Sequence, residues 1–578
     1  MNRAGDRSDP ARRRSDPGQP DRSDPNPGQL DLRLLPIALA VWLGTLGGLL
    51  GGVRETLAVA AVAATVAVPA FWRAVRSECG ERGRYRAVRP LPDTAARPVV
   101  RFGAALATVW GSRSVLAVVL VAGTGSAVGA IAEVHRSANP VAVLAAAHRT
   151  APVSAVIGSV PRPLGGAGPP GAVLVRVRVT GLPDGASARA GRPSRDGLDA
   201  PVTVLAEASW ARLRPGTRVA ATLRLAPRRR MGPDTASAVV RGPPRVLAGP
   251  TGIRRITGQV RAGLEHVSAP LGQPASGLLP AIVHGDTSRV PPAVAEQFRV
   301  SGLAHLEAVS GANVAIVVIA VSGIAISLGA GRRTTAVIGT AAVVAFAVLS
   351  DVSPPVVRAS ATAVLVLFGG RAAPGRGPAL LATAVTVLLL VDPWLAVDVG
   401  FALSVSATAG ILAAAPRFTA ALGCWLPRPL AQAAGIAVAA QTACQPLLTA
   451  ISAQVGLVAP FTNIAAEPAV ATLAGLAAAV LAALPGPAPI GALLGTGATG
   501  AAQLGGSACR WLATVARTGA DAPGATVGWS ATPAGLAVAV AVSAVVLGFG
   551  PVLLRRRRPT LVVSAVIVGM LIGPVVAW

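Results

Sequence analysis

Long runs without a charged residue recur along this chain, and they restrict its possible folds more than any other feature. One run, from Ala308 to Gly331, is long enough to cross the hydrocarbon core of a bilayer as a helix. Hydrophobic residues make up 52% of the 578 residues, and charged residues only 13%. A water-soluble globule of this size does not need so much apolar material. The sequence therefore predicts a polytopic α-helical membrane protein.

The distribution of charge predicts how the chain is oriented in the membrane. All 52 basic residues are arginines, and nine of them lie in the loop 73–113. Because cytoplasmic loops carry the excess of basic residues, this loop and the N-terminus are expected in the cytoplasm. Counting apolar runs from there gives about 13 spans and a C-terminus outside the cytoplasm. The formal net charge of +27 suits a polyanionic ligand, although positive loops raise the charge of any membrane protein.

Segments of different composition divide the chain. Residues 1–30 repeat Arg-Ser-Asp-Pro amid proline and glycine, which predicts a disordered N-terminal tail. Residues 31–135 contain three apolar runs, which are expected to form three transmembrane helices around the basic loop. Residues 251–300 are expected to form an amphipathic segment at the membrane interface and then a re-entrant one. Residues 301–530 would form the main transmembrane core, and residues 531–578 the last transmembrane helices.

Residues 150–250 differ from the rest, because short runs with alternating apolar residues replace the long ones. In Val173–Val179, for example, arginines alternate with valines. This period of two, with glycine and proline turns between about five such runs, predicts a small antiparallel β domain. Its size fits an OB-like barrel, and its position after the third span places it outside the cytoplasm.

The predicted barrel is basic, with fifteen arginines and five acidic residues between residues 151 and 248. Such a surface attracts a phosphate backbone in a salt-dependent way. It has one aromatic residue, however, and base stacking normally supplies much of the affinity for single strands. DNA binding and a purely structural role, in gating or packing, both remain open. The candidate DNA contacts are Arg176, Arg178, Trp210, Arg218 and Arg224.

Several polar residues interrupt the apolar runs of the core. Ser310 and Asn313 lie on one face of a helix, and Gly311 permits close approach of another backbone. Arg358 enters an apolar helix one turn after two prolines, so it either faces a pore or reaches back to the interface. Asp392 and Asp398 are placed to cap the helices that follow them, which is compatible with a further function. The four cysteines have no metal-ligand spacing and are expected to fill apolar space.

Several motifs resemble those of the ComEC family in their residues and in their order along the chain. The ComEC proteins are the membrane channels through which bacteria take up single-stranded DNA. The matching elements are Gly285-Asp286, Phe298-Arg299-x-Ser301-Gly302-Leu303-x-His305-Leu306, Val309-Ser310-Gly311-x-Asn313-Val314, Asp351–Ser360, Asp392–Ser404, Gln441–Pro446 and Pro460–Pro468. Asn313 stands where many family members have histidine, and Ala402 replaces a glutamine.

The resemblance implies a channel that imports single-stranded DNA across the bacterial cytoplasmic membrane during natural transformation, without enzymatic activity, cofactor or metal of its own. A DNA receptor, a separate nuclease and a cytoplasmic helicase or translocase are further expected partners, beside the DNA and the lipid bilayer. Many family members continue into a metallo-β-lactamase-like domain. The five dispersed histidines here provide no such metal cluster, so no nuclease domain is expected.

Together, the polar residues and the motifs define candidates for a wet path through the core. They are His284, Asp286, His305, Ser310, Gly311, Asn313, Arg358, Asp392, Asp398, Phe401, Ser404, Gln441, Gln445, Asn463 and Glu467. We expect several of them to converge on one cavity, with Arg358 attracting the DNA and Asp398 or Glu467 balancing its charge.

Two other classes of protein remain possible from the sequence. A transporter or flippase of lipid or polymer would have the same architecture and similar buried polar residues. An intramembrane serine protease would use the Ser310-Gly311 pair as its nucleophile motif. That reaction requires a general base, and no later span contains a histidine.

Overall fold

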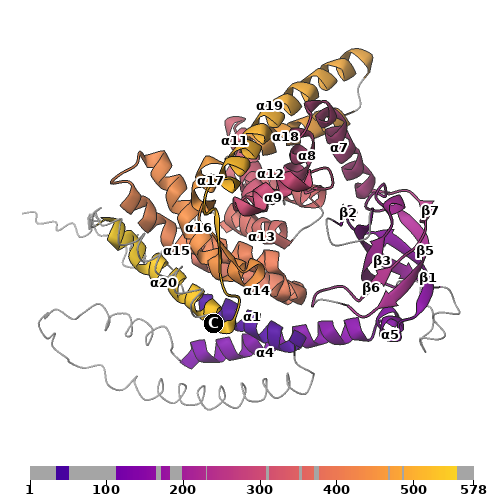
Figure 1. Cartoon of the computed structure of the whole chain (residues 1–578), viewed down its shortest axis with the longest axis horizontal. Coiled ribbons are helices and arrows are strands. Elements are labelled where there is room, and N and C mark those ends of the chain that lie inside the picture. The colour runs from indigo at the N-terminus through magenta and orange to yellow at the C-terminus, as the bar shows by residue number, and fades with distance from the viewer. Residues whose placement is uncertain are drawn as a thin grey trace, which may run out of the picture.

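The computed structural model describes ten segments of the chain. They are residues 34–50, 112–164, 171–182, 198–228, 231–307, 311–350, 354–369, 376–466, 469–484 and 487–555. The predicted tail 1–30, the second and the last of the predicted spans, and most of the loop 73–113 lie outside these segments. The described chain is mostly helical, and one small barrel stands beside the helices (Figure 1).

The barrel confirms the prediction of a small β domain. Five strands close it in the order β1-β3-β4-β6-β5, with β5 pairing back to β1. All these pairings are antiparallel except β4 with β6, which is parallel. Two short strands, β2 and β7, extend the sheet at β3 and β5. The strands are β1 (Thr150–Ile157), β2 (Arg162–Pro163), β3 (Val173–Gly181), β4 (Ala200–Ala206), β5 (Arg218–Ala226), β6 (Ala236–Val239) and β7 (Arg245–Ala248).

The helices are α1 (Leu35–Leu50), α4 (Ser112–Ser137), α5 (Pro140–Ala146), α7 (Ile253–Ser268), α8 (Ala275–His284), α9 (Pro292–Val300), α10 (Ala304–Glu307), α11 (Gly311–Ser327), α12 (Arg332–Leu349), α13 (Pro354–Gly369), α14 (Gly377–Val391), α15 (Val399–Leu422), α16 (Arg428–Ser452), α17 (Ala459–Ala465), α18 (Ala469–Ala483), α19 (Ala488–Ala520) and α20 (Pro533–Arg555). A short 3₁₀ helix, η3 (Pro393–Val397), precedes α15, and β8 (Gln454–Gly456) pairs with β9 (Thr526–Gly528).

Four of the described helices are long and apolar enough to cross a bilayer by length and composition. They are α12, α15, α16 and α20. Shorter apolar helices, such as α1, α11, α13, α14 and α18, accompany them. The total of about 13 spans and the side on which each terminus lies stay predictions.

Glycines at four-residue spacing allow α1 and α4 to pack backbone against backbone, side by side (Figure 1). A Cβ on Gly44 would overlap the carbonyl oxygen of Ala122, and one on Gly48 would overlap that of Ser126. From the other helix, a Cβ on Gly125 would lie 2.7 Å from the Val41 carbonyl oxygen, and one on Gly129 2.6 Å from that of Thr45. Small residues at this spacing are typical of interfaces between membrane helices.

The ten-residue helix α8 is buried over its whole length. It lies against α7, α18 and α19, where Leu278, Leu279 and Ile282 pack against Cys509 and Leu512. Ten residues of helix rise only about 15 Å, half of the hydrocarbon thickness, so α8 cannot cross a bilayer alone. Short helices of this kind are tolerated at membrane depth where protein surrounds them.

Helix α7 differs from the expected interfacial helix in one respect. Its exposed residues include Ile253 and Ile256, but Arg261 is buried. The Arg261 guanidinium donates to the carbonyl oxygen of Leu349, at 3.0 Å from its Nε, at the C-terminal end of α12. The last carbonyls of a helix have no partner within that helix. Arg261 therefore joins α7 to α12 instead of pointing to water.

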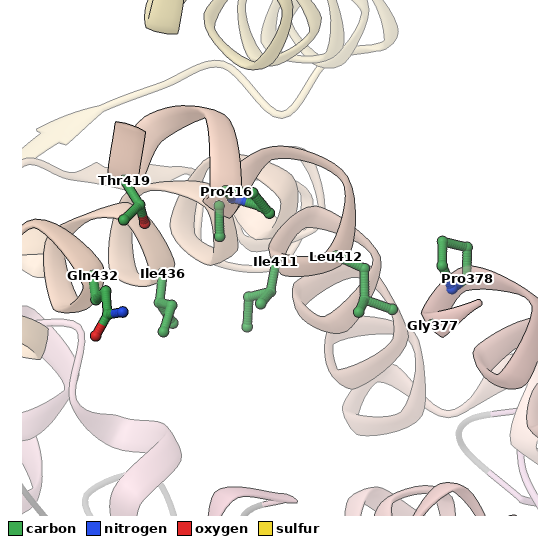
Figure 2. Close-up of a pocket in the computed structure, with 9 residues that line it drawn as sticks. Gly377, Pro378, Ile411, Leu412, Pro416, Thr419, Gln432 and Ile436 are labelled. Atoms are coloured by element: carbon green, nitrogen blue, oxygen red, sulfur yellow. The ribbon is translucent and has the colours of Figure 1, made fainter. Parts of the chain in front are cut away.

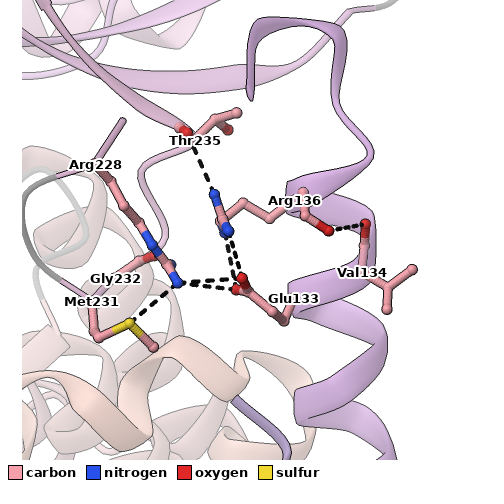
Figure 3. Close-up of polar contacts among 8 residues, drawn as sticks. Glu133, Val134, Arg136, Arg228, Met231, Gly232 and Thr235 are labelled. Carbon is pink, nitrogen blue, oxygen red and sulfur yellow. Dashed lines mark hydrogen bonds and ion pairs between the residues drawn. The ribbon is translucent and has the colours of Figure 1, made fainter. Parts of the chain in front are cut away.

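One cluster fastens the barrel to the membrane part of the chain (Figure 3). The Glu133 carboxylate, near the end of α4, accepts hydrogen bonds from Arg136 and from Arg228 of the barrel, the latter at 3.3 Å. Arg136 also donates to the Thr235 carbonyl oxygen, and the Arg228 guanidinium lies 5.4 Å from the ring centre of Trp394 in η3. One carboxylate therefore pairs with two mostly buried guanidiniums, and the cluster keeps one net positive charge.

Removal of the Glu133 charge is expected to loosen the barrel. In Glu133→Gln, hydrogen exchange of residues 231–235 should accelerate by about tenfold or more, because hydrogen bonds to charged groups contribute ~1.5–3 kcal/mol each. Glu296→Gln is the matched control, since it breaks the Glu296–Arg299 pair on α9, away from the barrel. Equal exchange in both variants would contradict a fastening role for Glu133.

Candidate functional site

The motif between Phe298 and Leu303 holds α9 against α17. Phe298 and Leu303 are fully buried, and the Ser301 carbonyl oxygen accepts a hydrogen bond of 2.7 Å from Thr462 Oγ1. Gly302 has φ of 79°, a left-handed conformation that favours glycine, and a Cβ there would clash with Ala459. These motif residues are therefore explained by packing.

The first turn of α11 has two polar contacts on different sides. Asn313 is buried, and its Nδ2 donates to the Ile282 carbonyl oxygen of α8 at 2.9 Å. Its Oδ1 accepts a hydrogen bond of 3.4 Å from Thr472 of α18. Asn313 thus ties three helices together. Gly311, two residues earlier, faces α13 instead, and Ser310 lies outside the described residues.

Arg358 is the charged residue at the meeting point of α11, α13 and α15. It is only 6% exposed, which argues against a side chain that reaches the interface. Its Nε donates to Ser404 Oγ of α15 at 2.8 Å. A Cβ on Gly311 would lie 2.8 Å from its Nη2, so the absence of a side chain at Gly311 makes room for the guanidinium. The structure therefore brings Gly311, Arg358 and Ser404 together. Convergence of the candidates on one cavity stays a prediction.

The predicted charge balance at Arg358 by Asp398 is wrong. Among the described residues, no carboxylate lies within ion-pair distance of Arg358. The Asp398 carboxylate instead caps α15, since its Oδ1 accepts from the Phe401 backbone N–H at 2.7 Å. Asp392 Oδ1 likewise accepts from the Trp394 N–H at 3.1 Å. Glu467, the other candidate, lies outside the described residues.

The candidates on α16 form a row of hydrogen bonds. Gln441 Nε2 donates to Gln445 Oε1 at 3.0 Å, and Gln445 Nε2 donates to Thr449 Oγ1 at 3.1 Å. Gln445 also reaches the backbone of Gln454, whose side chain accepts from Arg299 of α9 at 3.3 Å. Polar groups therefore continue from α16 to α9. Sequence spacing predicted the first pair, but the contact with Arg299 spans 155 residues and left no local signal.

The remaining core candidates do not join Arg358. Phe401 is fully buried, with its ring centre 5.2 Å from that of Trp42 in α1. Asn463 Nδ2 donates back to the Ala459 carbonyl oxygen of its own helix. His284 and Asp286 are buried at the end of α8, where Asp286 Oδ1 accepts from the Ser288 N–H.

Around the short helix α10, two titratable groups precede the uncharged run. His305 is exposed, with Nδ1 3.2 Å from the Gly302 carbonyl oxygen. Burial of the Glu307 carboxyl raises its pKa to about 7, and its Oε1 has no hydrogen-bond partner among the described residues.

A cavity of about 520 Å³ lies between the start of α14, α15 and α16 (Figure 2). Its lining includes Pro378, Ile411, Leu412 and Ile436, with polar side chains from Thr419 and Gln432. None of the candidate residues contributes to it. This cavity is therefore mostly apolar and separate from the Arg358 cluster.

In the barrel, the arginine candidates are exposed but Trp210 is not. Trp210 is 1% exposed, and its Nε1 donates to the Gly242 carbonyl oxygen at 3.1 Å. Its prediction as a DNA contact is therefore wrong, because a ring in the barrel core cannot stack on a base. Arg176 pairs with Asp234 and Arg178 with Asp199, each at 3.2 Å.

The comparisons with known proteins agree with the sequence motifs. Residues 282–557 match the model of a family described as competence protein. This region contains the Arg358 cluster, the row on α16 and the four helices long enough to cross a bilayer. No curated protein matches the chain, and no solved structure matches it either. Over residues 282–557, just under half of its length, the chain is similar to the competence protein family, and this match is consistent with the ComEC type.

Proposed function

We propose that the chain is a membrane channel that imports single-stranded DNA across the cytoplasmic membrane. Similarity to the competence family over residues 282–557 suggests a role in DNA uptake. The observation that carries the finer proposal is the buried Arg358, whose guanidinium is held by Ser404 in a space left by Gly311. A buried charge within a membrane protein is a functional hypothesis by default.

The environment of Arg358 suits contact with a moving polyanion. With no carboxylate at ion-pair distance among the described residues, its positive charge is available for a phosphate. A hydroxyl partner such as Ser404 orients the guanidinium without neutralising it. Transport requires contacts favourable enough for entry and weak enough for release. A single orienting hydrogen bond to the guanidinium is compatible with both entry and release of a phosphate.

The barrel is a second argument for DNA import, because it is proposed to be an OB-like domain. Its strand order, with one parallel pair between β4 and β6, is that of a five-stranded Greek-key barrel. OB folds bind oligonucleotides on the face of their second and third strands, which correspond to β3 and β4. Arg178 is exposed on β3, and its row on the outer surface continues through Val156 of β1 to Arg218 of β5, so the exposed arginines extend beyond β3 and β4. The proposal places the phosphate backbone on this exposed row.

Binding of single-stranded DNA to the purified full-length chain is expected to be weak and strongly dependent on salt. With about four phosphate contacts, affinity should fall roughly fiftyfold between 50 and 200 mM salt. Arg218→Ala and Arg224→Ala should have the largest effects in the barrel, because neither arginine forms an ion pair among the described residues. Fluorescence anisotropy of a labelled oligonucleotide measures both quantities.

Two further variants separate the barrel contribution from other effects. Arg510→Ala removes an exposed arginine of α19 and should leave the affinity unchanged. Trp210→Ala should unfold the barrel, at a cost of ~3–5 kcal/mol for a large buried side chain, instead of removing a stacking contact. Salt-independent binding, or a folded Trp210→Ala barrel that no longer binds DNA, would count against the phosphate contacts proposed here.

The import function is tested by uptake of labelled DNA into a form that nucleases cannot reach. A transformable strain that lacks its own channel gene would receive either this chain or an empty vector. Protected DNA only in the presence of the chain supports the proposal. Surface-bound DNA without protected DNA would show a binding protein that does not transport.

A further inference from the structure

Two arginines line one cavity between α15 and α20. The cavity has a volume of about 380 Å³ and is lined by Arg417 of α15 and by Gly548, Pro551, Val552 and Arg555 of α20. Both arginines are exposed. Apart from them, the lining residues carry no charged or polar side chain. The cavity thus combines a basic rim with an apolar floor.

The packing beside the cavity keeps the two helices together. Phe418, which follows Arg417, is buried, and a Cβ on Gly550 would lie 3.2 Å from its ring. Leu547 and Leu554 also pack against the buried cluster that contains Phe418. Because α15 and α20 are held at this point, the side chains of Arg417 and Arg555 share one space in the folded chain.

Neither arginine is balanced by an acidic side chain. Among the described residues, Arg417 and Arg555 form no ion pair. Two positive charges at one cavity repel each other, and an anion between them would relieve this repulsion. Arginine is well suited to phosphate, since its planar guanidinium can donate two parallel hydrogen bonds.

An apolar stripe on α20 leads to this basic rim. Val545, Phe549 and Val552 are 50%, 64% and 47% exposed. They lie at positions i, i+4 and i+7, so they share one face of the helix, and Arg555 follows three residues later on the same face. A free phosphate would not use such a stripe, but an acyl chain would.

We infer that this cavity binds an anionic phospholipid. The headgroup phosphate lies between Arg417 and Arg555, and an acyl chain follows the stripe from Val552 to Val545. Basic pockets between membrane helices bind acidic lipid headgroups in the same way. The site is separate from the Arg358 cluster, and the inference does not depend on DNA transport.

Lipid binding to the purified full-length chain tests this inference. By native mass spectrometry, phosphatidylglycerol is expected to bind more tightly than phosphatidylcholine, and Arg417→Gln with Arg555→Gln should weaken its binding roughly thirtyfold, about fivefold per arginine. Phe549→Ser should weaken both lipids, because it interrupts the stripe. Arg510→Gln is the matched control and should bind as the unaltered chain does.

The following results would each overturn the inference of a phospholipid site. Equal affinity for the two lipids, or full phosphatidylglycerol binding by the double variant, would overturn it. Inorganic phosphate is the second probe: if millimolar phosphate displaced the lipid, the site would recognise a free anion and not a phospholipid. Both arginines are exposed, so the melting temperature of the double variant in detergent alone should match that of the unaltered chain. A lower melting temperature without lipid would show a structural role for the arginines instead.

Discussion

Substitution of Arg358 by alanine is expected to reduce protected DNA uptake to the level of a strain without the chain. We expect a fall of roughly a hundredfold or more, since loss of one partner in a desolvated charge contact costs ~2–5 kcal/mol. The buried Arg358 guanidinium beside Ser404 is the positive charge that DNA would contact in this part of the proposed path. Uptake of labelled DNA after nuclease treatment gives the measurement, together with the level of the protein in the membrane.

Three other variants show what Arg358 contributes. Arg358→Lys should keep part of the activity, because it retains the positive charge but not the guanidinium geometry. Ser404→Ala should have a smaller effect, since it removes only the orienting hydrogen bond. Arg333→Ala, an exposed arginine of α12, is the control and should transport normally. Normal uptake by Arg358→Ala would remove the central residue of the proposed path.

The second large effect is expected at the contact between α1 and α4. Gly48→Ala places a Cβ on the Ser126 carbonyl oxygen, so the two backbones must separate. Overpacking of a tight contact costs ~1–3 kcal/mol, and more where only backbone can move. The melting temperature of the detergent-purified chain should therefore fall, and less folded protein should be recovered.

The neighbouring residue provides the control for Gly48→Ala. A Cβ on Gly47 would lie 3.9 Å from Ser126 Oγ, which is an ordinary contact. Both substitutions bring the same gain in helix propensity, so the difference between them measures the clash alone. If Gly47→Ala and Gly48→Ala had equal melting temperatures, the close contact of α1 with α4 would not contribute to stability.

Patterns with a short period were readable from the sequence, and they predicted the barrel and the apolar helices. Alternating valines in β3 specify which face is buried, because side chains along a strand point to opposite sides. The spacing of Gln441 and Gln445 likewise places both on one face of α16. Gly44 with Gly48, and Gly125 with Gly129, carried the same kind of signal, and the sequence reading missed it.

Partners distant in the chain could not be predicted. Arg358 bonds to Ser404, 46 residues away, and nothing in the local sequence distinguishes Ser404 from Asp398 as its partner. Charge alone favoured Asp398, but a carboxylate at the start of a helix also satisfies backbone N–H groups. The burial of Trp210 could not be predicted either, because one aromatic residue in a barrel fits either the core or a binding surface.

The buried helix α8 has a consequence for how the protein is made. Its packing partners on α18 and α19 are synthesised much later, for example Ala471 187 residues and Cys509 225 residues after His284, the last residue of α8. During that interval α8 lacks both a bilayer-spanning length and most of its protein surroundings, since of α7, α18 and α19 only α7 precedes it. We therefore expect this segment to remain at the translocon or with an insertase until α19 has been made, and chains truncated before α18 to be degraded at α8 first.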